Sequence, residues 1–161
     1  MAYGVFISHS SRDRGLVIAL ARLLAKFGID VSVAEWYLAP GVRVDKKVFA
    51  QIEKSDSVVV LLTRDGLRSN WVQQEVGYAL RAKKTIIPLV EKGTDSRNLA
   101  SLQGKEYIEY DPLQPEQSLI RVSDYVKSPR TRKETKEEQE KTLLLAGGIL
   151  AFLLLLFGAE K

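Results

Sequence analysis

The chain has 161 residues, of which 45% are hydrophobic and 27% charged, a composition typical of a globular protein with room for one domain and an appendage. It contains no cysteine, which excludes disulfides and thiolate chemistry. Its single histidine, His9, argues against a histidine metal cluster or a Ser-His-Asp triad, so we expect no metal site. The net charge is only +4, and much of the positive charge lies near the C-terminus, so nucleic acid is not an expected partner.

Short apolar runs alternate with helical patterns along residues 1–127, which is typical of βαβ units and a parallel sheet. The pattern predicts strands at residues 3–7, 29–33, 57–62, 85–90 and 106–110. Helices are predicted at residues 16–27, 48–52, 70–84 and 115–127. This alternation predicts an α/β, flavodoxin-like fold: a five-stranded parallel sheet of order 2-1-3-4-5 with helices on both faces. In such folds, ligands bind beyond the carboxyl ends of the strands.

The C-terminal part of the chain differs in composition. Residues 128–141 are polar throughout, which predicts a charged linker or a solvent-exposed helix. Residues 143–159 carry no charge and would span roughly 25 Å as a helix, so we expect a transmembrane helix over residues 142–159. A buried C-terminal helix is the alternative, but such a helix would show a polar face, and this run has none.

The excess of lysine and arginine before the apolar run predicts the orientation of this helix. The first ten residues do not resemble a secretory signal. We therefore expect a single-pass, tail-anchored protein of the cell membrane, with residues 1–127 in the cytoplasm.

The helix predicted to begin at Asn70 carries two stripes of side chains. Residues advance by about 100° each along a helix, so one stripe faces the core. Its members are Val72, Val76, Ala79 and Leu80. Trp71, Glu75 and Tyr78 form the second stripe at the margin of the core. Glu75 is therefore expected near the carboxyl edge of the sheet, although its helical position alone leaves an ordinary surface glutamate as the alternative.

Residues from other strand ends converge on the same edge. Those that follow the first three predicted strands are Ser8 and His9, Glu35 and Trp36, and Thr63 to Asp65. The glycine-rich phosphate loops are absent, because the chain contains neither GxGxxG nor GxxxxGKS/T. A response regulator would need acidic residues after the first and third strands, which this chain lacks, so that class is excluded.

Four segments together resemble a Toll/interleukin-1 receptor (TIR) domain, and most of all the prokaryotic kind. They are VFISHSSRD (5–13), LAPGVR (38–43), SVVVLLT (57–63) and SNWVQQE (69–75). The resemblance runs from about residue 3 to residue 127 with consistent spacing, so we expect a TIR domain over residues 1–127. It does not cover the linker or the apolar run.

The resemblance implies an enzyme that cleaves the bond between nicotinamide and ribose in NAD+, giving nicotinamide and ADP-ribose or a cyclic ADP-ribose isomer. NAD+ would be the substrate, and no cofactor is implied. The catalytic glutamate of the family's W-x-x-x-E pattern matches Glu75, with Trp71 as its aromatic partner. Ser8, Glu35 and Trp36 are expected to line the NAD+ site together with Trp71. The alternatives are that the two tryptophans are core aromatics and that Ser8 only caps the following helix.

The resemblance also implies self-association, because TIR enzymes often become active when neighbouring domains join head to tail. A membrane anchor would raise the effective concentration for that contact. Immune defence in a prokaryote, by NAD+ depletion or through a product signal, is the role implied. A non-catalytic, membrane-anchored TIR scaffold is the main alternative, against which the presence of Glu75 argues. A host-directed effector is a third, disfavoured by the membrane tail.

Overall fold

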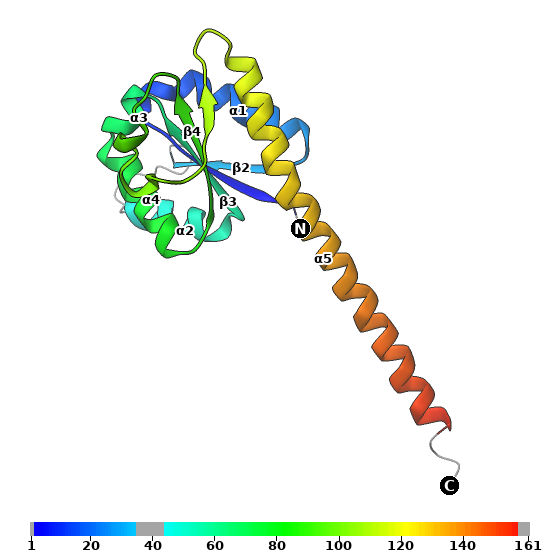
Figure 1. Cartoon of the computed structure of the whole chain (residues 1–161). Helices are drawn as coiled ribbons and strands as arrows, with labels where there is room; N and C mark the ends of the chain where they lie inside the picture. Colours follow the sequence, from blue (N-terminus) through cyan, green and yellow to red (C-terminus); the bar gives the residue numbers. More distant parts are fainter. Residues whose placement is uncertain (1, 35–43, 158–161) are drawn as a thin grey trace. The chain divides into compact units, whose positions relative to one another are not determined.

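The computed structural model describes the backbone of residues 2–34 and 44–157 (Figure 1). Within these ranges the side chains of residues 44, 96, 129–136, 138, 139, 146 and 148–157 are not described. The sheet is built of parallel strands: β1 (Gly4–Ser8), β2 (Asp30–Val33), β3 (Ser57–Leu62), β4 (Thr85–Glu91) and β5 (Ile108–Tyr110). Their order, β2-β1-β3-β4-β5, confirms the predicted sheet.

Helical segments connect the strands and flank the sheet. In chain order they are η1 (Ser11–Asp13), α1 (Arg14–Lys26), α2 (Val44–Lys54), α3 (Arg64–Arg68), α4 (Asn70–Arg81), η3 (Ser96–Asn98), η4 (Ala100–Leu102) and α5 (Pro115–Phe157), where η denotes a 3-10 helix. Figure 1 shows α2 and α4 on one side of the sheet and α1 with residues 115–124 of α5 on the other. This arrangement is the predicted one.

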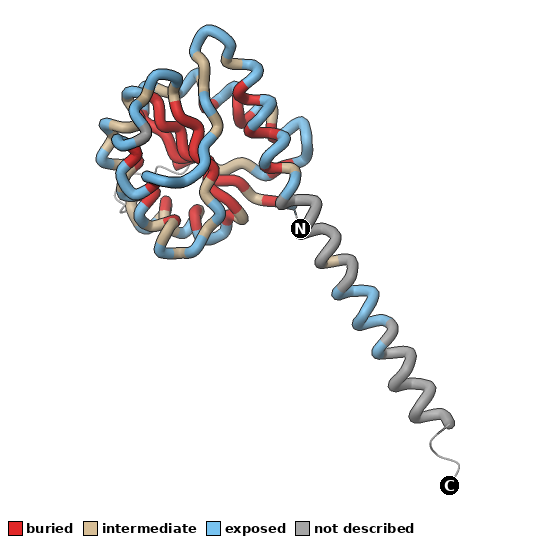
Figure 2. Tube along the Cα trace, in the orientation of Figure 1, coloured by how far each residue is buried: buried red, intermediate tan, exposed pale blue. Residues whose placement is uncertain are grey.

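The centre of the sheet is β3, in which all residues are buried. Figure 2 shows this buried centre in red, surrounded by helices that are exposed on their outer sides. Aliphatic and aromatic side chains from β1, β3, α2 and α4 form one cluster on the α2–α4 face, which includes Phe6, Val58, Val60, Ile52, Val72 and Val76. Because α4 turns its valines into this cluster, the neighbouring stripe with Glu75 lies at the cluster's margin.

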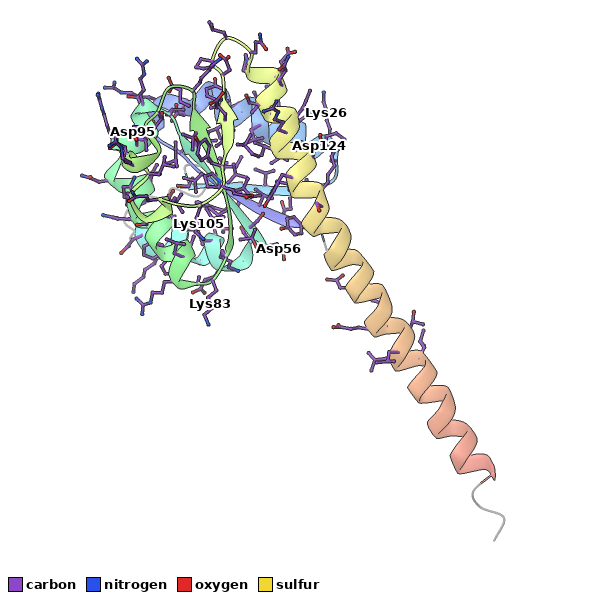
Figure 3. All side chains as sticks on the ribbon, in the orientation of Figure 1. Lys26, Asp56, Lys83, Asp95, Lys105 and Asp124 are labelled. Carbon is purple, nitrogen blue, oxygen red and sulfur yellow. The ribbon has the colours of Figure 1, made fainter. Side chains whose placement is uncertain are left out.

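Polar contacts lock the amino edge of the sheet, opposite the edge where ligands are expected. Asp56, labelled in Figure 3, accepts a hydrogen bond from the Gly4 backbone N–H at 2.8 Å. The Lys84 ammonium donates to the carbonyl oxygens of Glu53 at 2.6 Å and of Ser55 at 2.8 Å, at the end of α2. These contacts join β1, β3 and the flanks of α2 and α4 at the amino edge.

The sequence pattern predicts no helix between the strand at 57–62 and the helix that begins at Asn70, whereas the structure has the short helix α3 there. Thr63 begins it, because its Oγ1 accepts a hydrogen bond from the Gly66 N–H at 3.0 Å as an N-cap. Gly66 is needed at this position, since a Cβ there would lie 2.1 Å from the Leu61 carbonyl oxygen. The absence of a side chain at Gly66 therefore lets α3 pack directly against the end of β3.

The chain divides into two compact units, Met1–Asp124 and Tyr125–Lys161. The predicted helix at 115–127 and the predicted linker at 128–141 are continuous in the backbone of α5. In the predicted transmembrane helix at 142–159, the backbone of residues 142–157 is helical as part of α5, whereas the last two residues and most of the side chains are not described. Among the residues that the structure does describe, no helix is both long enough and apolar enough to cross a membrane.

Replacing Gly66 by alanine is expected to destabilise the fold by about 1–3 kcal/mol, the usual cost of overpacking a filled site. The matched control is Gly77→Ala, because a Cβ at Gly77 meets nothing within 4 Å and alanine favours the helix there. Urea unfolding of the full chain in detergent micelles measures both. Equal stability of the Gly66→Ala variant and the wild type would contradict the proposed close packing of α3.

Candidate active site

Glu75 lies in the second turn of α4 and is the one carboxylate of the predicted site that the structure describes. The helix begins at Ser69, whose Oγ accepts a hydrogen bond from the Val72 N–H at 3.3 Å. Only 1% of Glu75 is exposed, so it is not the ordinary surface glutamate that its helical position allowed. The Ser8 hydroxyl, at the end of β1, donates a hydrogen bond to Glu75 Oε2.

Burial controls the protonation of Glu75. Removal from water disfavours the charged form and raises the pKa of the Glu75 carboxyl from 4.5 to about 8. Hydrogen bonding from Ser8, and to a smaller extent from Trp71, opposes this rise by favouring the carboxylate. The protonated form therefore predominates at neutral pH in the free protein, and a cation placed beside Glu75 would favour its ionisation.

The two oxygens of Glu75 differ in their surroundings. Oε1 is buried and has no hydrogen-bond partner among the described residues. Burying an oxygen without a partner is costly, so such an atom calls for a specific explanation. An oxygen that accepts hydrogen bonds from a bound ligand supplies one. Oε2 of the carboxyl group therefore accepts a hydrogen bond from Ser8, whereas Oε1 can still accept one.

Trp71 lies one helical turn before Glu75 and is half-buried against the margin of the core cluster. The predicted stripe of Trp71, Glu75 and Tyr78 divides between two surroundings. Tyr78 faces α2: its ring stacks on Phe49 with 4.0 Å between ring centroids, and its hydroxyl donates to the Glu53 carboxylate. Trp71 and Glu75 thus remain the part of the stripe that belongs to the candidate site.

Ser8 is free to serve the site because a different serine caps the following helix. The N-cap of η1 is Ser10, whose Oγ accepts a hydrogen bond from the Arg12 N–H at 3.3 Å. His9 is buried, and its Nδ1 lies 3.4 Å from the Ile7 carbonyl oxygen. The alternative in which Ser8 is only a cap is therefore wrong.

Two predicted members of the site, Glu35 and Trp36, lie outside the described residues, as does the LAPGVR segment at 38–43. Their role in an NAD+ site stays a prediction. No three side chains of histidine, aspartate or glutamate come together as a possible metal site in the part of the chain that the structure describes.

Sequence reasoning placed Thr63 at this edge of the sheet without a role, and it missed the polar side chain that Thr63 contacts there, that of Asp13. Asp13 Oδ2 accepts a hydrogen bond from Thr63 Oγ1 at 2.7 Å and another from Ser10 Oγ at 3.0 Å. The sequence places Asp13 among the possible caps of the first helix and Thr63 at a strand end. The sequence gives one indication that the two side chains meet, which is that both follow strands that are neighbours in the predicted sheet.

Comparison with known proteins identifies the family. The model of the TIR domain family matches residues 5–121. The TIR domain of the Toll-related receptor TRR-2 from Hydra magnipapillata has 22% identity and a TM-score of 0.61, over 76% of this chain and 99% of that one.

Two other solved structures are similar in fold. The Clostridium botulinum CMP N-glycosidase BcmB has 20% identity and a TM-score of 0.58, over 76% of this chain and 98% of that one. A TIR-STING receptor from C. gigas, solved with 2',3'-cGAMP, has 20% identity and a TM-score of 0.61, over 74% of this chain and 39% of that one. At these identities the likeness shows the fold alone. The comparison with curated proteins found no match.

The raised pKa of Glu75 predicts a pH dependence of folding stability. The folded-state pKa of about 8 exceeds the ordinary value of 4.5, so the stability contribution is complete below pH 4.5 and is lost as the pH rises to about 8. At about 1.4 kcal/mol per pH unit, the loss over this window reaches about 5 kcal/mol. The variant Glu75→Gln, which cannot ionise, is expected to lose this decline and to be more stable than the wild type at pH 8.5.

Chemical denaturation of the full chain between pH 4.5 and 8.5 measures the effect. Glu109→Gln is the matched control, because Glu109 is an exposed carboxylate on β5, and its replacement should preserve the decline. Parallel stability curves for Glu75→Gln and the wild type across this range would show that burial of Glu75 does not control them.

Proposed function

Because the chain belongs to the TIR domain family, we propose that it is an NAD+ nucleosidase that cleaves the bond between nicotinamide and ribose. The observation that carries the proposal is the state of Glu75, a buried carboxyl with one oxygen held by Ser8 and the other without a partner among the described residues. A carboxyl in this state, at the edge where α/β folds bind ligands, is suited to catalysis rather than to support of the fold.

The proposed reaction separates NAD+ into two products. The bond between the ribose C1' and the nicotinamide nitrogen breaks, and its electron pair stays with nicotinamide, which leaves as a neutral molecule. The ribose becomes an oxocarbenium-like cation, and water attacks C1' to give ADP-ribose and a proton. Attack by a nitrogen of the substrate's own adenine would give a cyclic isomer instead. No acid is needed, because the nicotinamide of NAD+ is already a cation.

Glu75 would act as the carboxylate that stabilises the developing positive charge. Oε1 would accept a hydrogen bond from a ribose hydroxyl, while Ser8 holds Oε2 in place. The pKa of about 8 in the free protein is compatible with this role, because the cationic nicotinamide ring would favour ionisation of Glu75 as it binds. Trp71 would provide an aromatic wall that excludes water from the reacting bond.

The wider setting belongs to the same proposal. We propose that residues 142–159 anchor the protein in the cell membrane with the TIR domain in the cytoplasm, on the grounds of their charge-free sequence. Anchoring would concentrate the domains and favour their self-association. Immune defence in a prokaryote, by NAD+ depletion or by a product signal, is the role that these properties fit.

Nicotinamide release from NAD+ tests the function. The full chain, reconstituted in liposomes to bring the domains together, is expected to release nicotinamide. Glu75→Gln should reduce kcat by at least about 100-fold, the usual effect of removing one preorganised charge-stabilising group. Glu109→Gln, with its exposed carboxylate on β5, is the control that should keep full activity. Liquid chromatography of nicotinamide and of the sugar product measures both rates and products.

The pH dependence of this reaction separates two substrate classes. With NAD+, kcat/KM should rise with pH toward a plateau above about 8, because the ionised form of Glu75 is required. An N-glycoside with an uncharged leaving base, such as CMP, would instead need protonated Glu75 as an acid, so its cleavage should fall above that pH. If liposome-bound protein releases nothing from either substrate, the protein is a non-catalytic scaffold and the proposed activity is wrong.

A further inference from the structure

The end of β1 with the turn that follows it and the segment from Thr63 through α4 meet at two places near the carboxyl edge of the sheet. One is the hydrogen bond from Ser8 to Glu75, since Glu75 lies on α4, which follows β3 through α3. The other joins Thr63 Oγ1 to Asp13 Oδ2 at 2.7 Å, between residues 50 positions apart. The second contact includes no residue of the predicted NAD+ site.

The second contact is the centre of a chain of hydrogen bonds. The Gly66 N–H donates to Thr63 Oγ1 at 3.0 Å, and the Thr63 hydroxyl donates onward to Asp13. From the other side, the Ser10 hydroxyl donates to the same Asp13 oxygen at 3.0 Å while accepting from the Arg12 N–H. Each hydroxyl therefore both donates and accepts, which polarises and strengthens the neighbouring bonds. Ser10 and Thr63 are each only 7% exposed, so the bonds are largely shielded from water.

The chain of bonds reaches both partners of the catalytic contact. On one side, Asp13 is the last residue of η1, which is separated from Ser8 by only two residues. On the other side, Thr63 caps α3, and the Ser69 N–H that begins α4 bonds to the Gly66 carbonyl oxygen at 3.2 Å. Ser8 is the last residue of β1 and pairs with Val60 of β3, so the sheet already holds its backbone. The second contact adds a tie that fixes the η1 turn after Ser8 against the start of α3.

We propose that Asp13 and Thr63 are positioning residues, which clamp the β1 loop to the α3–α4 segment and thereby hold Ser8 against Glu75 for the reaction. The clamp is useful because the Ser8 hydroxyl holds Oε2 of Glu75, while Oε1 has no hydrogen-bond partner among the described residues. Only the kinetic part of this inference rests on the proposed NAD+ cleavage. Misplacement of a catalytic group by about 1 Å costs up to about 100-fold in rate, so loss of the clamp should be measurable.

Two readouts test the clamp in variants of the full chain, one of activity in liposomes and one by NMR in detergent micelles. The variants are Asp13→Ala and Thr63→Val, with Thr63→Ser as the matched control that keeps the hydroxyl. The first readout is kcat for nicotinamide release, with and without Ser8→Ala in the same chain. The second is the titration of the Glu75 side-chain carboxyl carbon by NMR, which needs no activity.

Asp13→Ala and Thr63→Val are each expected to lower kcat by about tenfold, and their combination should lower it no further. Thr63→Ser should stay within about twofold of the wild type. In a chain that already carries Ser8→Ala, Asp13→Ala should have no additional effect, because the clamp acts through Ser8. A purely structural weakening of the fold would instead add to the loss.

The NMR titration decides the proposal independently of catalysis. Loosening the Ser8 bond should move the titration of Glu75 to higher pH in Asp13→Ala and Thr63→Val, in the direction of Ser8→Ala. The sign is informative, because removal of the Asp13 charge alone would move it to lower pH. An unchanged titration and unchanged kcat in Asp13→Ala would overturn the clamp and leave Thr63 as a helix cap only. An inactive wild type would contradict the NAD+ activity, while the titration would still decide the clamp.

Discussion

The burial of one carboxyl group, that of Glu75, is the constraint on which the candidate site depends. A carboxyl that is 1% exposed is costly to ionise, and its pKa rises to about 8 although Ser8 and Trp71 oppose the rise. Burial of Glu75 lowers the free energy of unfolding as the pH rises toward the folded-state pKa, so the rest of the fold must compensate for this loss. A group that the fold would be more stable without is characteristic of a functional site.

The sheet and α4 together create this burial. β3 is buried along its whole length, and the valines of α4 pack against it, which brings the adjacent stripe of the helix to the end of β1. Gly66 lets α3 pack directly on the end of β3 and so sets where α4 begins. The geometry of the candidate site therefore comes from elements of the core, while the amino edge is closed by the contacts of Asp56 and Lys84.

Periodicity in the sequence is enough to predict the sheet order and to place Glu75 beside the core face of α4, because both follow from local spacing. The same spacing does not show that Glu75 is buried, since burial depends on Ser8 and on β1, which are distant in sequence. α3 was not predicted because Gly66 has the local signal of a turn, and its close approach to Leu61 exists only in the folded chain. For the same reason the contact between Asp13 and Thr63 has no local signal.

The most direct test of the account is whether substrate binding ionises Glu75. The measurement is the NMR titration of the Glu75 carboxyl carbon in the full chain, without and with an NAD+ analogue whose ribose ring oxygen is replaced by CH2 and which is therefore not cleaved. The account predicts a midpoint of about 8 in the free protein and a clearly lower midpoint in the complex, because the nicotinamide cation lies beside the carboxylate. A bound analogue that leaves the titration of Glu75 unchanged would contradict its assignment as the catalytic group.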